Sequence, residues 1–254
     1  MKEPKEVAIK AAEEAGKILM KSFRKEKEVR WKEAKELVTN VDLESENLIV
    51  GMIRENFPEH QLLSEEMGIS PGQEREYFWI VDPIDGTHNY AFGQPAFGLS
   101  IALAHGGEIV LGVINLPFYG ELYYAEKGKG AYLNGKPIHP SKTEKLSEAY
   151  ILYDPQLHKR ADMFTNLMKL YPKCFTIRII GCAVTDACAV AAGRADARIW
   201  HNTKLVDVAA GTLLVKEAGG KATDFNGRPL TLEGTEVIVS NGKIHNELVE
   251  ILKH

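Results

Sequence analysis

The chain is poor in cysteine and has no long apolar segment, and both shortages exclude classes of protein. Three cysteines in 254 residues cannot build a disulfide framework, so a reducing cytoplasm is the expected compartment. No apolar run approaches the roughly 18 residues that a membrane span needs. The first residues lead into a charged helical pattern rather than a secretory signal. We therefore expect a cytoplasmic protein without a membrane partner.

The chain also lacks an excess of basic residues. It has 31 Lys and Arg against 35 Asp and Glu, a net charge of −4, which argues against nucleic acid as a partner. Hydrophobic residues make up 44% and charged residues 26% of the chain, as is typical of globular proteins. We find no internal repeat and no low-complexity linker. The length suits one large domain or two modest ones.

The hydrophobic pattern predicts two parts with different rhythms. Residues 4–23 and about 42–57 show helical spacing, and the second helix would stop at Pro58. Strand-like segments follow at 77–81, 99–105, 108–115, 122–125 and 131–133, with turn signals between them. These predict an α+β subdomain with an antiparallel sheet over residues 1–140.

After residue 140, strands and helices alternate. Segments 149–153, 175–180 and 237–240 are strand-like, whereas 157–170, 182–193, 206–218 and 244–252 are helical. Gly219 and Gly220 would end the third of these helices. We predict an α/β subdomain over residues 141–254, with the boundary near residues 138–148.

The chemistry centres on residues 79–87, where an apolar strand ends in two carboxylates. Asp82 and Asp85 stand on either side of Pro83, and carboxylates at this spacing can converge on a hard cation such as Mg²⁺. The amides of Gly86, Thr87 and His88 would form a phosphate cradle at a helix start. The alternative is an Asp-rich turn in which Asp85 caps a helix.

Three other acidic positions favour the metal interpretation. Glu65 follows an apolar pair at an expected strand end, and Asp42 follows another apolar run at an expected helix start. Asp207 lies among small and branched apolar residues. Because an unpaired buried carboxylate is costly, Asp207 needs a cation or hydrogen-bond donors.

These segments resemble the inositol monophosphatase family of Mg²⁺-dependent, lithium-sensitive phosphatases. The resemblance covers essentially the whole chain and rests on four groups of residues: 37–42, 65–66, 82–90, and 206–211 with 217–220. It implies a layered α-β-α-β-α sandwich that combines α+β and α/β parts. It also implies a homodimer.

The resemblance assigns metal ligands by position. Glu65, Asp82 and the carbonyl of Ile84 would hold one Mg²⁺, and Asp82, Asp85 and Asp207 would hold a second. A weaker third ion would sit on Glu65, and Mn²⁺ is an alternative metal. Two such ions would bring the formal charge of the protein from −4 to about 0.

The resemblance also assigns the catalytic and phosphate-binding groups. Asp42, Thr87 and Glu65 would orient and deprotonate a metal-activated water that attacks the phosphate in line. Gly86, Thr87 and His88 would bind the phosphate. Cys182 and Cys188 have no catalytic role in this mechanism and are expected to be small buried residues.

Substrate contacts are expected from Asp85, Ala183, Trp200 and Asp207. Trp200 stands where animal inositol monophosphatases have an inositol-binding glutamate, and it would either fill the core or stack on a substrate ring. Lys204 would either bind a second phosphate or stay on the surface. Lys32 falls in a segment that corresponds to a mobile active-site loop of relatives.

The expected function is hydrolysis of a small phosphorylated metabolite, with inositol 1-phosphate as the first substrate to test. Fructose 1,6-bisphosphate, histidinol phosphate, NADP⁺ and 3′-phosphoadenosine 5′-phosphate are alternative substrates. An alternative of a different class is a non-catalytic regulator that binds metal or a phosphorylated metabolite.

Overall fold

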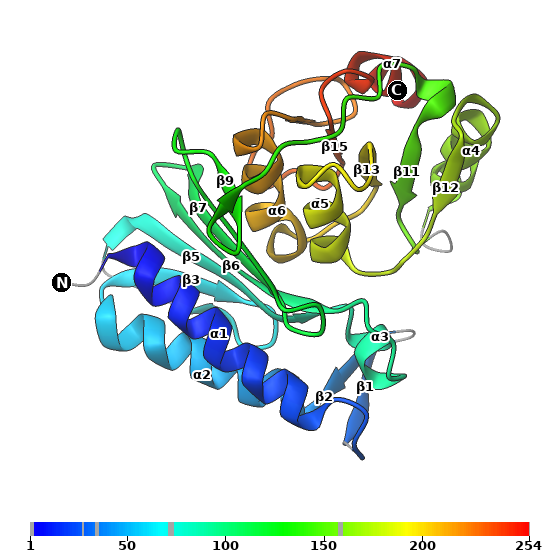
Figure 1. Ribbon diagram of the computed structural model, residues 1–254. Helices are drawn as coiled ribbons and strands as arrows, with labels where there is room; N and C mark the ends of the chain where they lie inside the picture. Colours follow the sequence, from blue (N-terminus) through cyan, green and yellow to red (C-terminus); the bar gives the residue numbers. More distant parts are fainter. Residues whose placement is uncertain (1–2, 27, 34–35, 71–73, 157–159, 254) are drawn as a thin grey trace.

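Five layers of secondary structure lie on one another in the computed structural model, which describes residues 3–26, 28–33, 36–70, 74–156 and 160–253. Figure 1 shows their order: helices α1 and α2, a large sheet, helices α5 and α6, a second sheet, and helices α4 and α7. The predicted α-β-α-β-α sandwich is confirmed. Apolar clusters fill the spaces between successive layers.

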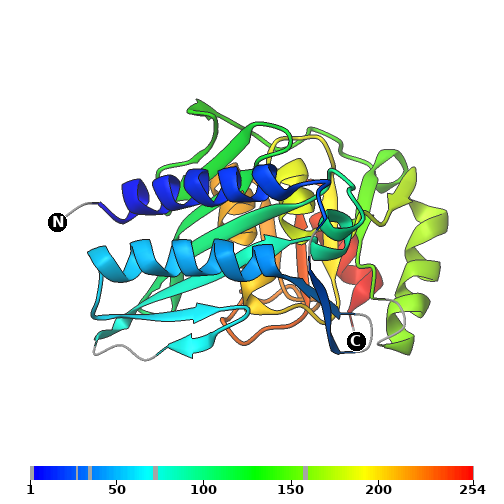
Figure 2. The same cartoon turned by 90° about the horizontal axis from the view of Figure 1, so that it is seen from below.

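The outer helical layer consists of α1 (Pro4–Ser22) and α2 (Asn40–Asn56). Its small apolar residues, such as Ala8, Ala11 and Ala15, are fully buried against α2 and the sheet, as their helical spacing predicts. Helix α2 begins two residues before Asp42, because Thr39 and Asp42 form a reciprocal capping box there. Both helices cover the same face of the sheet (Figure 2).

The large sheet has the strand order β10-β9-β8-β7-β6-β5-β3-β4. Its strands are β3 (His60–Ser64), β4 (Gly68–Ser70), β5 (Glu74–Asp85), β6 (Gly98–His105), β7 (Glu108–Leu116), β8 (Glu121–Glu126), β9 (Ala131–Leu133) and β10 (Lys136–Pro137). The predicted antiparallel hairpins are present, but β3 pairs with β5 in parallel.

Strand β5 is longer than predicted and carries the acidic motif. The sequence predicts a strand that ends at Val81 and a turn at Pro83, whereas the structure continues the strand to Asp85. Pairing with β6 is regular up to Asp82 and resumes at Asp85, so the register shifts across Pro83 and Ile84. Proline has no amide hydrogen to contribute to the ladder, which explains why the irregularity lies there.

The middle layer is buried between the two sheets and consists of α5 (Ala183–Ala191) and α6 (Leu205–Glu217). Helix α6 is apolar on almost every side, as expected for a helix that solvent barely reaches. Gly112 of β7 permits its close approach, because a Cβ atom there would lie 2.9 Å from the carbonyl oxygen of Ala210. This packing holds the first turn of α6 beside the end of β5.

The second sheet has the order β12-β11-β13-β15-β14, with β11 (Tyr150–Tyr153), β12 (Thr176–Arg178), β13 (Ala197–Trp200), β14 (Lys221–Thr223) and β15 (Val237–Ser240). Helices α4 (Ala161–Leu170) and α7 (His245–Leu252) cover its outer side (Figure 1). The sequence did not predict β13 or β14.

The strands of the two sheets come from opposite sides of residues 138–148, whereas the largest apolar cluster includes residues of both halves. The division into two subdomains stays a prediction.

The charged segment before α2 is an antiparallel hairpin of β1 (Val29–Glu33) and β2 (Glu36–Thr39), which the sequence did not predict. The side chain of Lys32 lies outside the described part of the structure. In the described residues, no helix combines the length and the apolar character that crossing a bilayer requires.

Candidate active site

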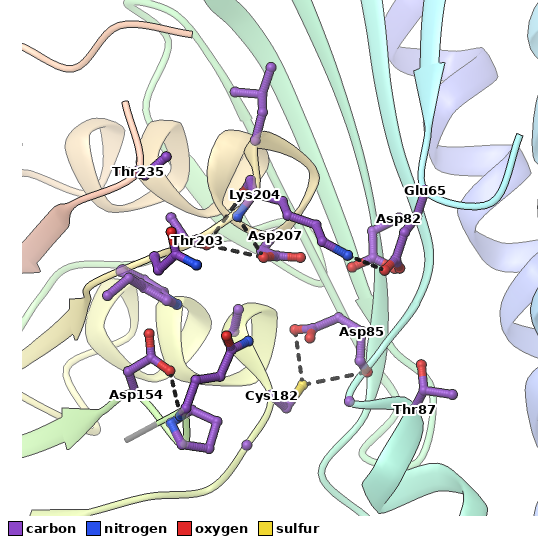
Figure 3. Close-up of a pocket in the computed structure, with 18 of the residues that line it drawn as sticks. Glu65, Asp82, Asp85, Thr87, Asp154, Cys182, Thr203, Lys204, Asp207 and Thr235 are labelled. Carbon is purple, nitrogen blue, oxygen red and sulfur yellow. Dashed lines mark hydrogen bonds and ion pairs between the residues drawn. The ribbon is translucent and has the colours of Figure 1, made fainter. Parts of the chain in front are cut away.

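A cavity of about 760 Å³ opens where the two halves of the chain meet. One wall comes from the ends of β3 and β5 and from α3 (Thr87–Ala91). The other comes from the first turns of α5 and α6, the end of β13, and the loop of residues 232–235. Figure 3 shows the acidic side chains of both walls pointing into the space between them.

The first wall carries Glu65, Asp82 and Asp85. Asp82 follows Phe78 and Ile80 at two-residue spacing, so the alternation of β5 turns it toward the middle layer and the cavity. Its Oδ1 atom accepts a hydrogen bond of 3.1 Å from the amide of Ile84. The amide of Glu65 donates to the carbonyl of Val81 at 3.2 Å, so Glu65 begins its turn beside Asp82.

Asp85 connects the two walls. Its Oδ2 atom accepts a hydrogen bond of 2.5 Å from the amide of Val184, in the first turn of α5. The thiol of Cys182 also donates to this oxygen, at 3.3 Å. One carboxylate oxygen of Asp85 is therefore held by the start of α5. Cys182 and Cys188 are both buried, as predicted.

Asp207 and Lys204 come from the start of α6. The Oδ2 atom of Asp207 accepts from the amide of Lys204 at 3.0 Å and from the hydroxyl of Thr203 at 3.1 Å. The ammonium group of Lys204 reaches across the cavity and lies 3.3 Å from Oε1 of Glu65 (Figure 3). The second wall thus contributes both a carboxylate and a cation.

Asp42 and Thr87, which are 45 positions apart, meet at the edge of the cavity. The hydroxyl of Thr87 lies 3.2 Å from Oδ1 of Asp42 and 2.9 Å from the carbonyl oxygen of Ile84. The other oxygen of Asp42 accepts from the amide and the hydroxyl of Thr39, at 2.8 and 2.6 Å. Asp42 is 1% exposed, so these contacts fix its carboxylate firmly.

Gly86, Thr87 and His88, which the sequence predicts as a phosphate cradle, line the cavity. Gly86 has a φ of +79°, and a Cβ atom there would lie 2.7 Å from the carbonyl oxygen of Ala96. The first amides of a helix have no partner within the helix, so those of Thr87 and His88 are suited to bind an anion. The side chain of His88 is exposed.

The chain is similar to known proteins over its whole length. The model of the inositol monophosphatase family matches residues 1–254. The chain belongs to the inositol monophosphatase family. A relative from Thermotoga maritima, named fructose-1,6-bisphosphatase/inositol-1-monophosphatase, is 36% identical over 96% of this chain and 94% of its own length. As a member of this family, the chain is a phosphoric monoester hydrolase.

Two further relatives carry a different name. A Nus factor SuhB from Pasteurella multocida is 33% identical over 96% of this chain and 93% of its own length. The crystal structure of the extragenic suppressor protein suhB from Bartonella henselae is 33% identical and has a TM-score of 0.93, covering 98% of this chain and 97% of that one. The solved inositol monophosphatase from Anabaena is 34% identical and has a TM-score of 0.88, covering 98% of this chain and 94% of that one, so the fold agrees with the family.

Three of the carboxylates that line this cavity have raised pKa values. Burial raises the pKa of Asp82 well above its usual value, and the charges of Glu65, Asp85 and Asp207 raise it further. Burial likewise raises the pKa of Asp85 to about 6 and that of Asp207 to about 7. The cluster therefore resists carrying its full negative charge unless a cation compensates it.

The donor set fits a hard divalent cation, and the inositol monophosphatase family is in general metal-dependent. Carboxylate oxygens and a backbone carbonyl are the ligands that Mg²⁺ and Mn²⁺ prefer. In the described part of the chain, no three His, Cys, Asp or Glu side chains already stand close enough to hold an ion.

The wall formed by the second half of the chain contains two of the predicted substrate contacts. Ala183 and Trp200, which the sequence predicts as substrate contacts, line the cavity, and Trp200 is 2% exposed. The indole ring packs on the guanidinium of Arg198, 4.8 Å from the ring centre, and Arg198 forms a buried ion pair of 2.8 Å with Asp186. Trp200 therefore both fills space and forms a wall of the cavity.

Several residues of this wall were not predicted from the sequence. Asp154, Gln156, Asn202 and Thr203 line the cavity, and Asp154 is 3% exposed. Its two oxygens accept from the amides of Gln156 and His201, at 2.9 and 3.2 Å. The available signal was the position of Asp154 directly after an apolar strand, which is the same signal that identified Asp82.

Proposed function

We propose that this member of the family is a Mg²⁺-dependent phosphatase for a small phosphate monoester, with inositol 1-phosphate as the first candidate substrate. The observation that carries the proposal is the meeting of four carboxylates (Glu65, Asp82, Asp85 and Asp207) in one cavity beside the first turn of α3. Carboxylates alone would repel a phosphate. A cation between them and the phosphate turns the repulsion into attraction.

The proposed ligands divide into two groups. Glu65, Asp82 and the carbonyl of Ile84 would hold one ion, and Asp82, Asp85 and Asp207 a second. Bound Mg²⁺ would supply the positive charge that neutralises the phosphate and lowers the pKa of the attacking water. Hydrolysis of phosphate monoesters is among the slowest uncatalysed reactions, which explains why such charge is needed.

The chain's own residues would position the nucleophile. Thr87 donates to Asp42 or to Ile84, and its oxygen can accept from a water in the cavity. Burial raises the pKa of Asp42 to about 6, with Thr39 and Thr87 hydrogen bonds opposing the rise. A base whose pKa is near the working pH accepts a proton effectively, so Asp42 would receive the proton of the water through Thr87.

Substrate and phosphate would lie between the two walls. The amides of Gly86, Thr87 and His88 would hold the phosphate, and Asp85, Ala183, Trp200 and Asp207 would contact the rest of the substrate. Trp200 would contact a cyclitol or sugar ring through the small part of its indole that lines the cavity. Lys204 would attract a second phosphate, which makes fructose 1,6-bisphosphate the leading alternative substrate.

A panel of esters tests the proposal. We expect phosphate release from inositol 1-phosphate or fructose 1,6-bisphosphate, with dependence on Mg²⁺ and inhibition by Li⁺. Histidinol phosphate, NADP⁺ and 3′-phosphoadenosine 5′-phosphate complete the panel. Asp82→Asn should abolish the activity while leaving the fold intact. Retention of more than about a tenth of the activity by this variant would overturn the metal assignment.

A second, regulatory role is supported by the relatives named Nus factor SuhB. In that case the chain would bind metal or a phosphorylated metabolite without turning it over. Absence of phosphate release from every ester, together with measurable binding of Mg²⁺ or inositol 1-phosphate in calorimetry, would favour it. The predicted homodimer would be tested by sedimentation at micromolar concentration.

A further inference from the structure

The beginning of α2 carries three buried polar side chains on one side. Asp42, Ser45 and Glu46 are spaced by three and four residues, so they share a face of the helix. Each is at most 1% exposed. Helix α2 packs on the outer face of the large sheet, largely through apolar side chains (Figure 2). Packing alone therefore does not require polar side chains at these three positions. Buried polar groups are costly without partners, so their contacts are informative.

Each of the three contacts a different segment of the active site. Asp42 contacts Thr87, as described above. The hydroxyl of Ser45 donates to the carbonyl oxygen of Pro83 at 3.0 Å. Pro83 stands in the irregular part of β5, between Asp82 and Asp85. Ser45 therefore fixes the one stretch of β5 that the ladder with β6 leaves irregular.

Glu46 holds the chain on both sides of Glu65. Its Oε1 atom accepts from the amides of Glu66 and Met67, at 2.9 and 3.1 Å, and from the hydroxyl of Ser64. The intervening residue, Glu65, is the one whose carboxylate lines the cavity. The Oε2 atom of Glu46 has no hydrogen-bond partner among the described residues.

The energetics separate Glu46 from an ordinary turn anchor. A carboxylate buried with one oxygen unpartnered costs more than a neutral side chain that accepts the same bonds. Charge-assisted bonds are shorter and roughly twice as strong as neutral ones, so Glu46 gives a stiffer anchor than glutamine would. Groups that orient metal ligands typically change metal affinity or activity by about 10- to 100-fold when mutated.

We propose that Glu46 is the positioning residue for Glu65, and that Ser45 does the same for the segment between Asp82 and Asp85. Helix α2 then acts as a template that sets the spacing of the metal-binding segments from behind the sheet. The inference rests on the proposed function, because it assigns Glu65, Asp82 and Asp85 to a metal site. It adds residues that contact neither metal nor substrate.

The test compares Glu46→Gln, Glu46→Ala and Ser45→Ala with the wild-type protein. Glu44→Gln is the matched control, because Glu44 lies on the same helix and is exposed, and the substitution removes the same charge. Calorimetry measures the affinity for Mg²⁺, and hydrogen exchange measures protection of the amides of residues 66 and 67. We expect about tenfold weaker Mg²⁺ binding for Glu46→Gln, more for Glu46→Ala, and a few-fold for Ser45→Ala.

Kinetics provide a second readout. A misplaced Glu65 should lower kcat in saturating Mg²⁺ with little change in KM, since the substrate wall is untouched. A folded Glu46→Gln variant with faster exchange at residues 66 and 67, but with wild-type Mg²⁺ affinity and kcat, would reduce Glu46 to a turn anchor and overturn the inference. If Glu46→Ala does not fold, Glu46→Gln decides.

The outcome also distinguishes this inference from the proposed function. A wild-type protein that neither binds Mg²⁺ nor releases phosphate would overturn the proposed function. The metal part of the inference would fall with it. Unchanged exchange at residues 66 and 67 in Glu46→Gln would overturn the anchoring of Glu65 by itself, whatever the wild-type protein does with Mg²⁺.

Discussion

Replacing Asp207 with asparagine should stabilise the metal-free protein while weakening its response to Mg²⁺. Burial, followed by the charges of Asp85 and Glu65, raises the pKa of Asp207 from 3.8 to about 7. Asparagine keeps an oxygen that can accept from the amide of Lys204 and the hydroxyl of Thr203, so the start of α6 should survive. The substitution removes the charge and replaces the other oxygen of Asp207 with an NH₂ group.

The magnitude follows from the pKa. A raised carboxyl pKa favours folding below the unfolded-state value near 4, and this contribution is lost as the pH rises through 7. Full ionisation at pH 8 costs at most about 4 kcal/mol. Because the carboxylate is only half-buried at the cavity, water screens part of this cost, and we expect about 2 kcal/mol. In a protein of this size that raises Tm by roughly 4–8 °C.

Thermal unfolding in EDTA checks the prediction. Asp207→Asn should melt above wild type at pH 8, and the difference should shrink toward zero near pH 4. Addition of Mg²⁺ should raise the Tm of wild type more than that of the variant, because only the ion held by Asp82, Asp85 and Asp207 loses a ligand. Glu247→Gln, an exposed change on α7, is the control and should alter neither value. A variant that is less stable than wild type in EDTA at pH 8 would refute the reasoning, because the charge would then stabilise α6.

Three further predictions concern the rest of the structure. Thr87→Ala should lower kcat by about 100-fold, whereas Thr87→Ser should keep most of it; equal loss in both would remove Thr87 from the relay to Asp42. Gly86→Ala should lower the free energy of unfolding by about 3 kcal/mol or more in urea, because its Cβ would lie 2.7 Å from the oxygen of Ala96; wild-type stability would contradict this. Burial lowers the pKa of His245 to about 4. Its contribution to the free energy of unfolding is therefore complete above pH 6.5 and falls by up to about 3 kcal/mol as the pH drops to 4. Denaturant unfolding of His245→Gln should show a smaller pH dependence of the free energy of unfolding in this range.

The sequence was most informative about elements that a local pattern of residues determines. Helices α1 and α2 follow their apolar spacing, α6 follows a nearly continuous apolar run, and the hairpin of β6 and β7 follows its turn glycines. Asp82, Asp85, Asp42, Glu65 and Asp207 line or border one cavity, because each follows an apolar segment whose end the fold brings there. Their roles as ligands stay a prediction.

The sequence was least informative where tertiary packing decides. Strand β13 contains Arg198, which reads as a surface residue until Asp186 of α5 pairs with it in the core. Ser45 and Glu46 look like polar surface positions of an amphipathic helix, yet both are buried. The parallel pairing of β3 with β5 is invisible in a single strand's alternation. Each of these depends on a segment distant in the chain.

The hydrogen bond between Asp85 and the amide of Val184 has a consequence for the order of folding. It joins residues 99 positions apart, and the contact between Lys204 and Glu65 spans 139 positions. Such long-range closures come late, because the entropy of the intervening chain must be lost first. During synthesis the first sheet can form before the residues of the second wall of the cavity have been added. Activity should therefore return after the helical and strand signals in a refolding experiment, which makes catalysis a reporter of the last docking step.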